Sequence, residues 1–170
     1  MTRFEAVVLP HLDAAYTLAR YLTRNAQDAE DVVQDACLRA LTYFDGFRGE
    51  EGTSARAWLL TIVRNTAFSS RRRERPDAVA LEFDEALHSG AVAEQHPEAA
   101  LLRSGAKESL GRALDGLAPE FREVIVLREL EGLSYKEISD VAGVPVGTVM
   151  SRLSRARARL QEALRKEEGG

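Results

Sequence analysis

The chain has 170 residues, of which 45% are hydrophobic, 29% charged and only 6% aromatic, and its formal net charge is −4. This length allows one domain or two small ones, and the composition is that of a folded protein. The purely apolar runs are only about four residues long, too short for a membrane span or a signal-peptide core. We therefore expect a cytoplasmic protein without membrane insertion.

The sequence carries no recognisable catalytic or metal-binding pattern. One cysteine, Cys37, excludes an internal disulfide, and the three histidines are scattered without zinc-site spacing. The glycine-rich phosphate loops and the nucleophile elbow of common enzymes are also absent. We therefore expect no enzymatic activity, no cofactor, no metal and no small-molecule substrate.

Charge divides the chain into three parts. Residues 76–104 contain one arginine against six acidic residues, a net charge of −5, together with two prolines and no sustained helical period. Residues 1–75 and 105–170 are nearly neutral and rich in strong helix formers. The sequence therefore predicts an all-α protein, with two small helical modules (1–75 and 105–170) joined by a flexible acidic linker (76–104). Whether the modules pack together is left open.

Three helices are predicted in the first module, over about residues 2–23, from about residue 28 to just before Gly46, and over about residues 54–73, because apolar residues recur there at helical spacing. The second of these helices has two distinct faces. Its apolar stripe consists of Val32, Val33, Ala36, Cys37, Ala40, Leu41 and Phe44. Another face carries Asp31, Gln34, Asp35 and Leu38.

The third predicted helix combines a core face with a basic one. Its buried stripe includes Trp58, and the other side carries Arg64, Asn65, Phe68 and Arg72. The helix closes in an arginine run over residues 71–75. Cations, an amide and an aromatic ring suit contacts with phosphates and bases, although an arginine run can also serve only to complement the helix dipole.

The second module is predicted to contain a helix-turn-helix. Helices are expected near residues 98–114 and over 119–130. Ser134 and Glu137 then have the spacing of a capping box, which starts a short helix that runs to about Ala142. Gly143 supplies the turn, and Pro145 opens a long final helix.

The final helix has a buried stripe and a basic face. The stripe consists of Val149, Leu153, Ala156 and Leu160. The basic face consists of Arg152, Arg155 and Arg159, with Ser151 beside them and no acidic residue between Asp140 and Glu162. A basic helix after a tight turn suits the DNA major groove, and a solvated arginine face is the alternative.

Two groups of segments resemble a known family. The segment from Asp28 to Ala36, with residues 57–59, residues 62–65 and the arginine run, resembles conserved region 2 of bacterial RNA polymerase sigma factors. Residues 132–138, followed by 145–152, resemble conserved region 4. Two such regions with only a short linker are similar to the extracytoplasmic-function (ECF, group 4) sigma factors of the sigma-70 family.

The resemblance implies the following partners and contacts. Core RNA polymerase would be bound through the clamp helices of its largest subunit and its flap region, with Asp31, Gln34 and Asp35 on the clamp helices. The loop over about residues 47–54 would capture a flipped base and so aid promoter melting. The −10 element would be contacted by Arg64, Asn65, Phe68, Arg71 and Arg72. The −35 element would be contacted by Arg128, Tyr135, Lys136, Ser151, Arg152 and Arg155.

The resemblance also implies an anti-sigma factor as a partner, one that could hold the protein at the inner membrane. Met150 stands where some members of the family have a basic residue, so the promoter sequence is left open. Two other functions compete with a sigma factor. A stand-alone helix-turn-helix regulator would explain residues 119–160 but gives no reason for the polar face of Asp31, Gln34 and Asp35. A pure interaction protein would use the same helical faces to bind another protein.

Overall fold

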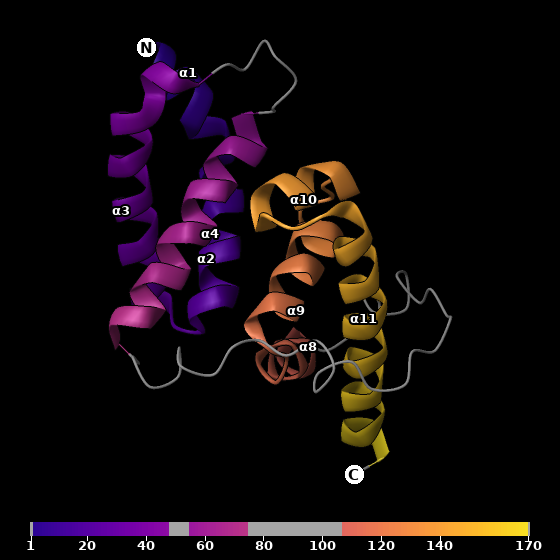
Figure 1. Ribbon diagram of the computed structural model, residues 1–170. Coiled ribbons are helices and arrows are strands. Elements are labelled where there is room, and N and C mark those ends of the chain that lie inside the picture. Colours follow the sequence, from indigo (N-terminus) through magenta and orange to yellow (C-terminus); the bar gives the residue numbers. More distant parts are fainter. Residues whose placement is uncertain (1, 48–54, 75–106, 170) are drawn as a thin grey trace.

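The computed structural model describes residues 2–47, 55–74 and 107–169, and within these ranges all regular structure is helical (Figure 1). This confirms the all-α prediction. The predicted linker and most of the loop 47–54 lie outside the described residues. The helices are α1 (Arg3–Val8), α2 (Leu12–Thr23), α3 (Ala26–Tyr43), α4 (Ala55–Glu74), α8 (Lys107–Asp115), α9 (Pro119–Ile125), α10 (Tyr135–Ala142) and α11 (Val146–Gly169).

The first module is a bundle in which α2, α3 and α4 pack against one another. The single helix predicted over about residues 2–23 is wrong, because a 3-10 turn over Leu9–His11 separates α1 from α2. Pro10 lies in this turn, and a proline inside a helix removes a backbone donor and clashes with the preceding turn. Asn25 then caps α3, its side chain accepting a hydrogen bond from the backbone N–H of Asp28 at 3.0 Å.

The core stripe of α3 is narrower than predicted. Val32, Ala36 and Ala40 are buried, whereas Leu41 is 57% exposed. Leu41 follows Val33 and Cys37 on a row at the margin of the stripe, and each step of four residues turns that row about 40° further around the helix. The expectation that Leu41 belongs to the core is therefore wrong.

The second module contains the predicted helix-turn-helix. The capping box at the start of α10 is present: the Ser134 hydroxyl accepts from the Glu137 N–H at 3.1 Å, and the Glu137 carboxylate accepts from the Ser134 N–H at 2.9 Å. Gly143 ends α10 with φ 71°. That left-handed conformation favours glycine. The α11 stripe is buried as predicted, and α9 continues into a π-helical turn over Val126–Leu130.

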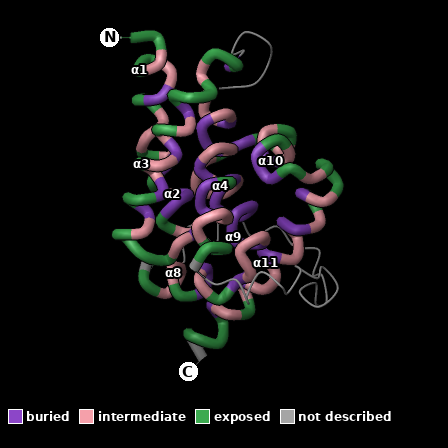
Figure 2. The backbone as a smooth tube through the Cα atoms, turned by 60° about the vertical axis from the view of Figure 1, so that its left-hand side comes forward, coloured by how far each residue is buried: buried purple, intermediate pink, exposed green. Residues whose placement is uncertain are grey.

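The two modules pack directly against each other. α10 lies on α4 and α9 lies on α2, so the magenta and orange halves are side by side in Figure 1. Buried residues of both halves form one continuous apolar cluster, and Figure 2 shows their buried segments turned toward each other. The face of α4 that was predicted to bind DNA therefore has a neighbour in the second module.

Candidate polymerase and DNA interfaces

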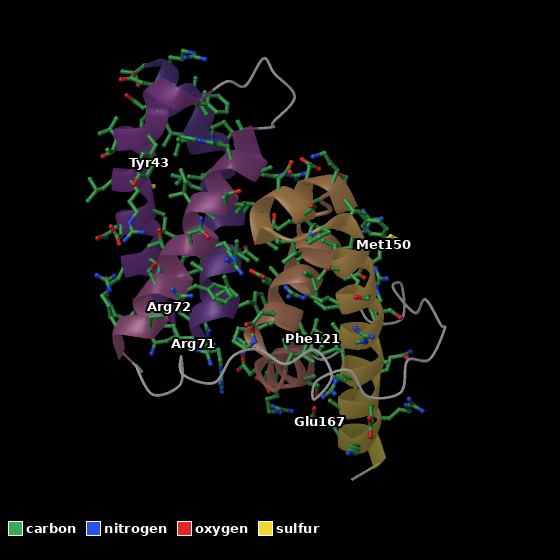
Figure 3. All side chains as sticks on the ribbon, in the orientation of Figure 1. Tyr43, Arg71, Arg72, Phe121, Met150 and Glu167 are labelled. Atoms are coloured by element: carbon green, nitrogen blue, oxygen red, sulfur yellow. The ribbon has the colours of Figure 1, made fainter. Side chains whose placement is uncertain are left out.

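The face of α3 that points away from the bundle combines acidic, amide and apolar side chains. Asp31 and Gln34 are exposed, and Asp35 is half-buried with an ion pair to Arg39 at 3.4 Å. Leu38, predicted on this face, is 66% exposed. Leu41, three residues after Leu38, is also exposed beside it, and Tyr43 is exposed at the C-terminal end of α3 (Figure 3 labels Tyr43). The result is a mixed polar and apolar surface suited to binding a protein.

The three −10 candidates Arg64, Asn65 and Phe68 form one cluster on α4. The guanidinium carbon of Arg64 lies 4.1 Å from the centre of the Phe68 ring, in a cation–π contact. Arg64 Nη1 also lies 3.4 Å from the Asn65 side-chain oxygen. The structure thus brings together the residues whose types suit contacts with phosphates and bases.

Arg64 is already occupied by an acidic partner from the second module. Its Nε donates to Oε2 of Glu123 at 2.8 Å, and its Nη2 donates to Oε1 of the same carboxylate at 3.2 Å. The Glu123 side chain is fully buried. This burial raises the pKa of Glu123 above its ordinary value, and the hydrogen bonds from Arg64 oppose the rise.

Sequence analysis missed Glu123, although a signal was present. Arg122 and Glu123 are the two charged residues that directly precede the apolar run Val124–Leu127, which begins in α9 and continues into the π-helical turn, and both are buried. Charged residues are almost never fully buried unless they are paired. A charged pair beside such an apolar run therefore indicates partners from another part of the chain.

Three arginines at the C-terminal end of α4, Arg71, Arg72 and Arg73, are exposed. Arg71 and Arg72 lie at the lower end of that helix in Figure 3, in the last helical turn, where positive charge complements the helix dipole. A cleft of about 380 Å³ adjoins this end of α4 and is lined by side chains of both modules. Arg24, Arg71, Arg122, Asp28 and Asp115 all line it.

The −35 candidates near the start of α10 form a second cluster. The guanidinium carbon of Arg128 lies 4.6 Å from the centre of the Tyr135 ring, and Nη1 of Arg128 donates to the carbonyl oxygen of Leu133 at 2.8 Å. Lys136 is exposed and pairs with Asp140 at 3.2 Å, one turn along α10. The first turn of the helix-turn-helix therefore presents cationic groups beside an aromatic ring.

The α11 candidates differ in exposure. Ser151 and Arg155 are half-buried, and the hydroxyl of Ser151 donates to the Thr148 carbonyl at 3.2 Å. Arg152 is only 8% exposed, because α11 packs on α9 and the negative charge of Glu123 lies close by. The sequence analysis had placed Arg152 on the basic face of the final helix, whereas the packing of α11 on α9 within the second module buries its side chain.

A further arginine of α11, outside the basic face, is neutralised by an acidic partner. Arg157 pairs with Glu129 at 2.7 Å, and both side chains are buried. In contrast, Val146 and Met150 are exposed at the N-terminal end of the helix. Figure 3 places Met150 at the edge of the second module, far from the first. The N-terminal end of a recognition helix is the part that meets base edges in a helix-turn-helix.

Within the described residues, no group of histidine, cysteine and acidic side chains is placed to hold a metal ion. None of the described helices has the length and apolar character needed to cross a membrane.

Comparisons with known proteins identify the two halves. Residues 7–76 match the family description "Sigma-70 region 2", and residues 107–160 match "Sigma-70, region 4". The chain belongs to the sigma-70 family. Its relatives include the RNA polymerase sigma-H factor of Pseudomonas aeruginosa, which is 36% identical over 95% of this chain and 86% of its own length. The ECF RNA polymerase sigma-E factor of Escherichia coli K12 is 37% identical over 84% of this chain and 76% of its own.

A solved structure with the same fold comes from Bartonella quintana. It is the sigma factor RpoE in complex with the anti-sigma factor NepR, and it superposes on this sigma factor with a TM-score of 0.73 and 34% identity. The match covers 97% of this chain and 98% of that chain. The family membership confirms the ECF sigma-factor prediction and disfavours a stand-alone helix-turn-helix regulator.

Proposed function

We propose that this sigma factor binds core RNA polymerase and directs it to promoters, with region 2 recognising the −10 element and region 4 the −35 element. The observation that carries the proposal is the coincidence of the two matched regions with two surfaces of suitable chemistry. The first module exposes a mixed acidic and apolar face on α3. The second presents a capped helix-turn-helix with cations at its first helix.

The polymerase contact is assigned to the exposed face of α3. Asp31, Gln34 and Asp35 supply polar groups, and Leu38 supplies an exposed apolar side chain beside them. A protein surface of this kind gains affinity from the apolar anchor and specificity from the surrounding polar groups. The clamp helices of the largest polymerase subunit are the proposed partner.

The DNA contacts are assigned to both modules. Arg64, Asn65, Phe68, Arg71 and Arg72 would contact the −10 strand, where the Phe68 ring can stack on a base and the arginines can bind phosphates. The −35 element would be contacted by Arg128, Tyr135, Lys136, Ser151, Arg152 and Arg155. Trapping an extruded base stabilises the melted promoter by offsetting the cost of unstacking.

An anti-sigma factor is the proposed inhibitory partner. Support comes from the Bartonella relative, which was solved in complex with one. The same exposed helical faces that would bind polymerase are the surfaces such an inhibitor must cover. We propose that the protein acts in the cytoplasm and as an initiation factor without enzymatic activity of its own.

The test is run-off transcription from sheared genomic DNA by bacterial core polymerase, with and without this protein. New discrete start sites that share −35 and −10 sequences are expected, and they would give the promoter consensus. If no transcripts form and the protein does not co-purify with core polymerase, the proposal fails. Binding to polymerase without transcripts would contradict the promoter-directing part alone.

A further inference from the structure

A two-point ion pair joins the modules, between Arg64 on α4 and Glu123 on α9. Both oxygens of the carboxylate are engaged, at 2.8 and 3.2 Å. This two-point geometry is the arrangement in which an arginine binds a carboxylate or a phosphate most strongly. Glu123 is fully buried, whereas the Arg64 side chain keeps 20% of its surface exposed.

Further hydrogen bonds cross the same boundary. Nη1 of Arg122 lies 2.9 Å from the carbonyl oxygen of Tyr21, and Nη1 of Arg56 lies 2.9 Å from that of Glu131. Arg24 also pairs with Asp115 at 3.8 Å, between exposed side chains. The junction is therefore held by charged groups at several points as well as by apolar packing.

Charged groups at a boundary make it separable. When two surfaces part, apolar side chains lose their burial, but a carboxylate and a guanidinium regain water. Burial of Glu123 is already costly, since it raises the pKa of this carboxyl despite the nearby Arg64 and Arg152 charges. The cleft between the modules is also polar, because Asp28, Asp115 and several arginines line it, so this part of the boundary buries little apolar surface.

Arg64 cannot serve two anions at once. In the proposed function its guanidinium contacts the −10 strand, yet in the packed arrangement both donor nitrogens that face α9 are used by the Glu123 carboxylate. A carboxylate and a phosphate offer the same kind of paired oxygen acceptors. Glu123 therefore lies where it competes with a DNA phosphate.

We propose that the Arg64–Glu123 contact is autoinhibitory: while the two modules are packed together it withholds Arg64 from the −10 strand, until a partner separates them. The part of this inference that concerns DNA rests on the proposed function of Arg64. The conformational part does not, because it follows from the contact itself. Binding that requires separated modules would thus be coupled to release of Arg64.

The test uses the full chain and reverses charges on each side of the contact. Glu123→Lys places a cation against Arg64, and Arg64→Glu places two carboxylates together, so each is expected to separate the modules. The double variant Arg64→Glu with Glu123→Lys restores opposite charges and is expected to close again. Glu108→Lys, at an exposed position on α8, makes the same charge change outside the contact and is the matched control.

Small-angle X-ray scattering gives the conformational result. A compact chain of this length has a radius of gyration of about 15.5 Å. Glu123→Lys and Arg64→Glu are expected to increase the radius over the wild type, while the control and the double variant do not. Circular dichroism verifies that helicity is kept. If Glu123→Lys unfolds the second module, the milder Arg56→Ala, which removes one cross-module hydrogen bond, is expected to give a smaller increase. Equal radii for wild type, Glu123→Lys and Arg56→Ala would overturn the proposal.

Binding of a fluorescent single-stranded −10 oligonucleotide tests the competition. Glu123→Lys is expected to bind roughly fivefold more tightly than Glu108→Lys, because one phosphate contact is released in addition to the shared charge change. A larger radius without tighter binding would uphold the contact but overturn the −10 role of Arg64. If Glu123→Lys binds the oligonucleotide more tightly but keeps the wild-type radius of gyration, the Arg64–Glu123 contact does not control the closure of the modules, and the proposal is overturned.

Discussion

The guanidinium of Arg122 on α9 donates a hydrogen bond to the carbonyl oxygen of Tyr21, although 101 residues separate them. The same side chain donates to the carbonyl oxygens of Leu114 at 3.0 Å and Leu117 at 2.9 Å. The last carbonyls of a helix have no partner within it, so Arg122 satisfies groups at the C-terminal ends of both α2 and α8. Desolvation lowers the pKa of Arg122 to about 10, with Arg24 as the second cause, so it stays charged at neutral pH.

Replacing Arg122 is therefore expected to be severely destabilising. Arg122→Met keeps the length of the side chain but leaves several buried carbonyls without a donor, at a cost of about 3 kcal/mol. Urea denaturation followed by circular dichroism measures the loss as a lower midpoint. Arg165→Met removes an exposed arginine from α11 and is expected to leave the midpoint unchanged. Equal midpoints for the two variants would contradict this role of Arg122.

Closure of the two modules is expected to depend on pH through Glu123. Burial raises the pKa of this carboxyl in the closed form, while Arg64 on α4 and Arg152 on α11 oppose the rise and Glu120 on α9 adds to it. The closed form thus binds the proton more tightly than an open form would. Its stability is greatest below the ordinary pKa of 4.5 and falls as the pH rises through the raised value.

The measurement is the radius of gyration from small-angle X-ray scattering as a function of pH, for the wild type and for Glu123→Gln. The glutamine has the same shape and no charge, so this variant is expected to stay closed and to lose the pH dependence assigned to residue 123. A wild-type radius that falls with rising pH would contradict the expected direction of the change. Identical pH profiles for both proteins would show that other groups are responsible.

The face of α3 that we propose to bind polymerase gives a third prediction. Asp31→Lys combined with Gln34→Ala is expected to weaken binding to core polymerase by about tenfold or more, equivalent to about 1.4 kcal/mol, because two polar contacts are lost. The unfolding midpoint should not change, since both side chains are exposed. Co-purification with core polymerase measures the effect, and Arg165→Glu is the charge-changing control. Unaltered polymerase binding with normal promoter-dependent transcription would move the contact to another surface.

Met150 is expected to influence the −35 sequence. It is 52% exposed one turn after Val146, at the end of α11 that would enter the major groove. An apolar side chain there can contact the methyl group of a thymine, and burial of one methyl is equivalent to about 0.8 kcal/mol or about fourfold in affinity. Replacing thymines of the −35 element singly by uracil, which lacks that methyl, should reduce transcription at one position. Met150→Ala should be insensitive to that replacement, and a variant as sensitive as the wild type would contradict the contact.

Local structure was largely predictable from the sequence. The helix-turn-helix depends on local features, namely its capping box at Ser134 and its turn at Gly143. The side chains that form these features lie within a few residues of one another, so the sequence pattern was enough to predict them. The buried α11 stripe likewise follows from helical spacing alone. The break at Pro10 could also have been predicted, because the cause is a single residue, but the apolar spacing on both sides of it concealed the interruption.

The sequence by itself determined the family, the two groups of helices and the residue types on the faces that we propose to contact polymerase and DNA. Only the tertiary structure decided that the modules pack together, that Glu123 of the second module engages Arg64, and that Arg152 is buried where α11 packs on α9. The physical reason is that burial of a charge depends on a partner far away in the chain. Glu123 lies 59 residues after Arg64, and no local spacing indicates that the two side chains meet.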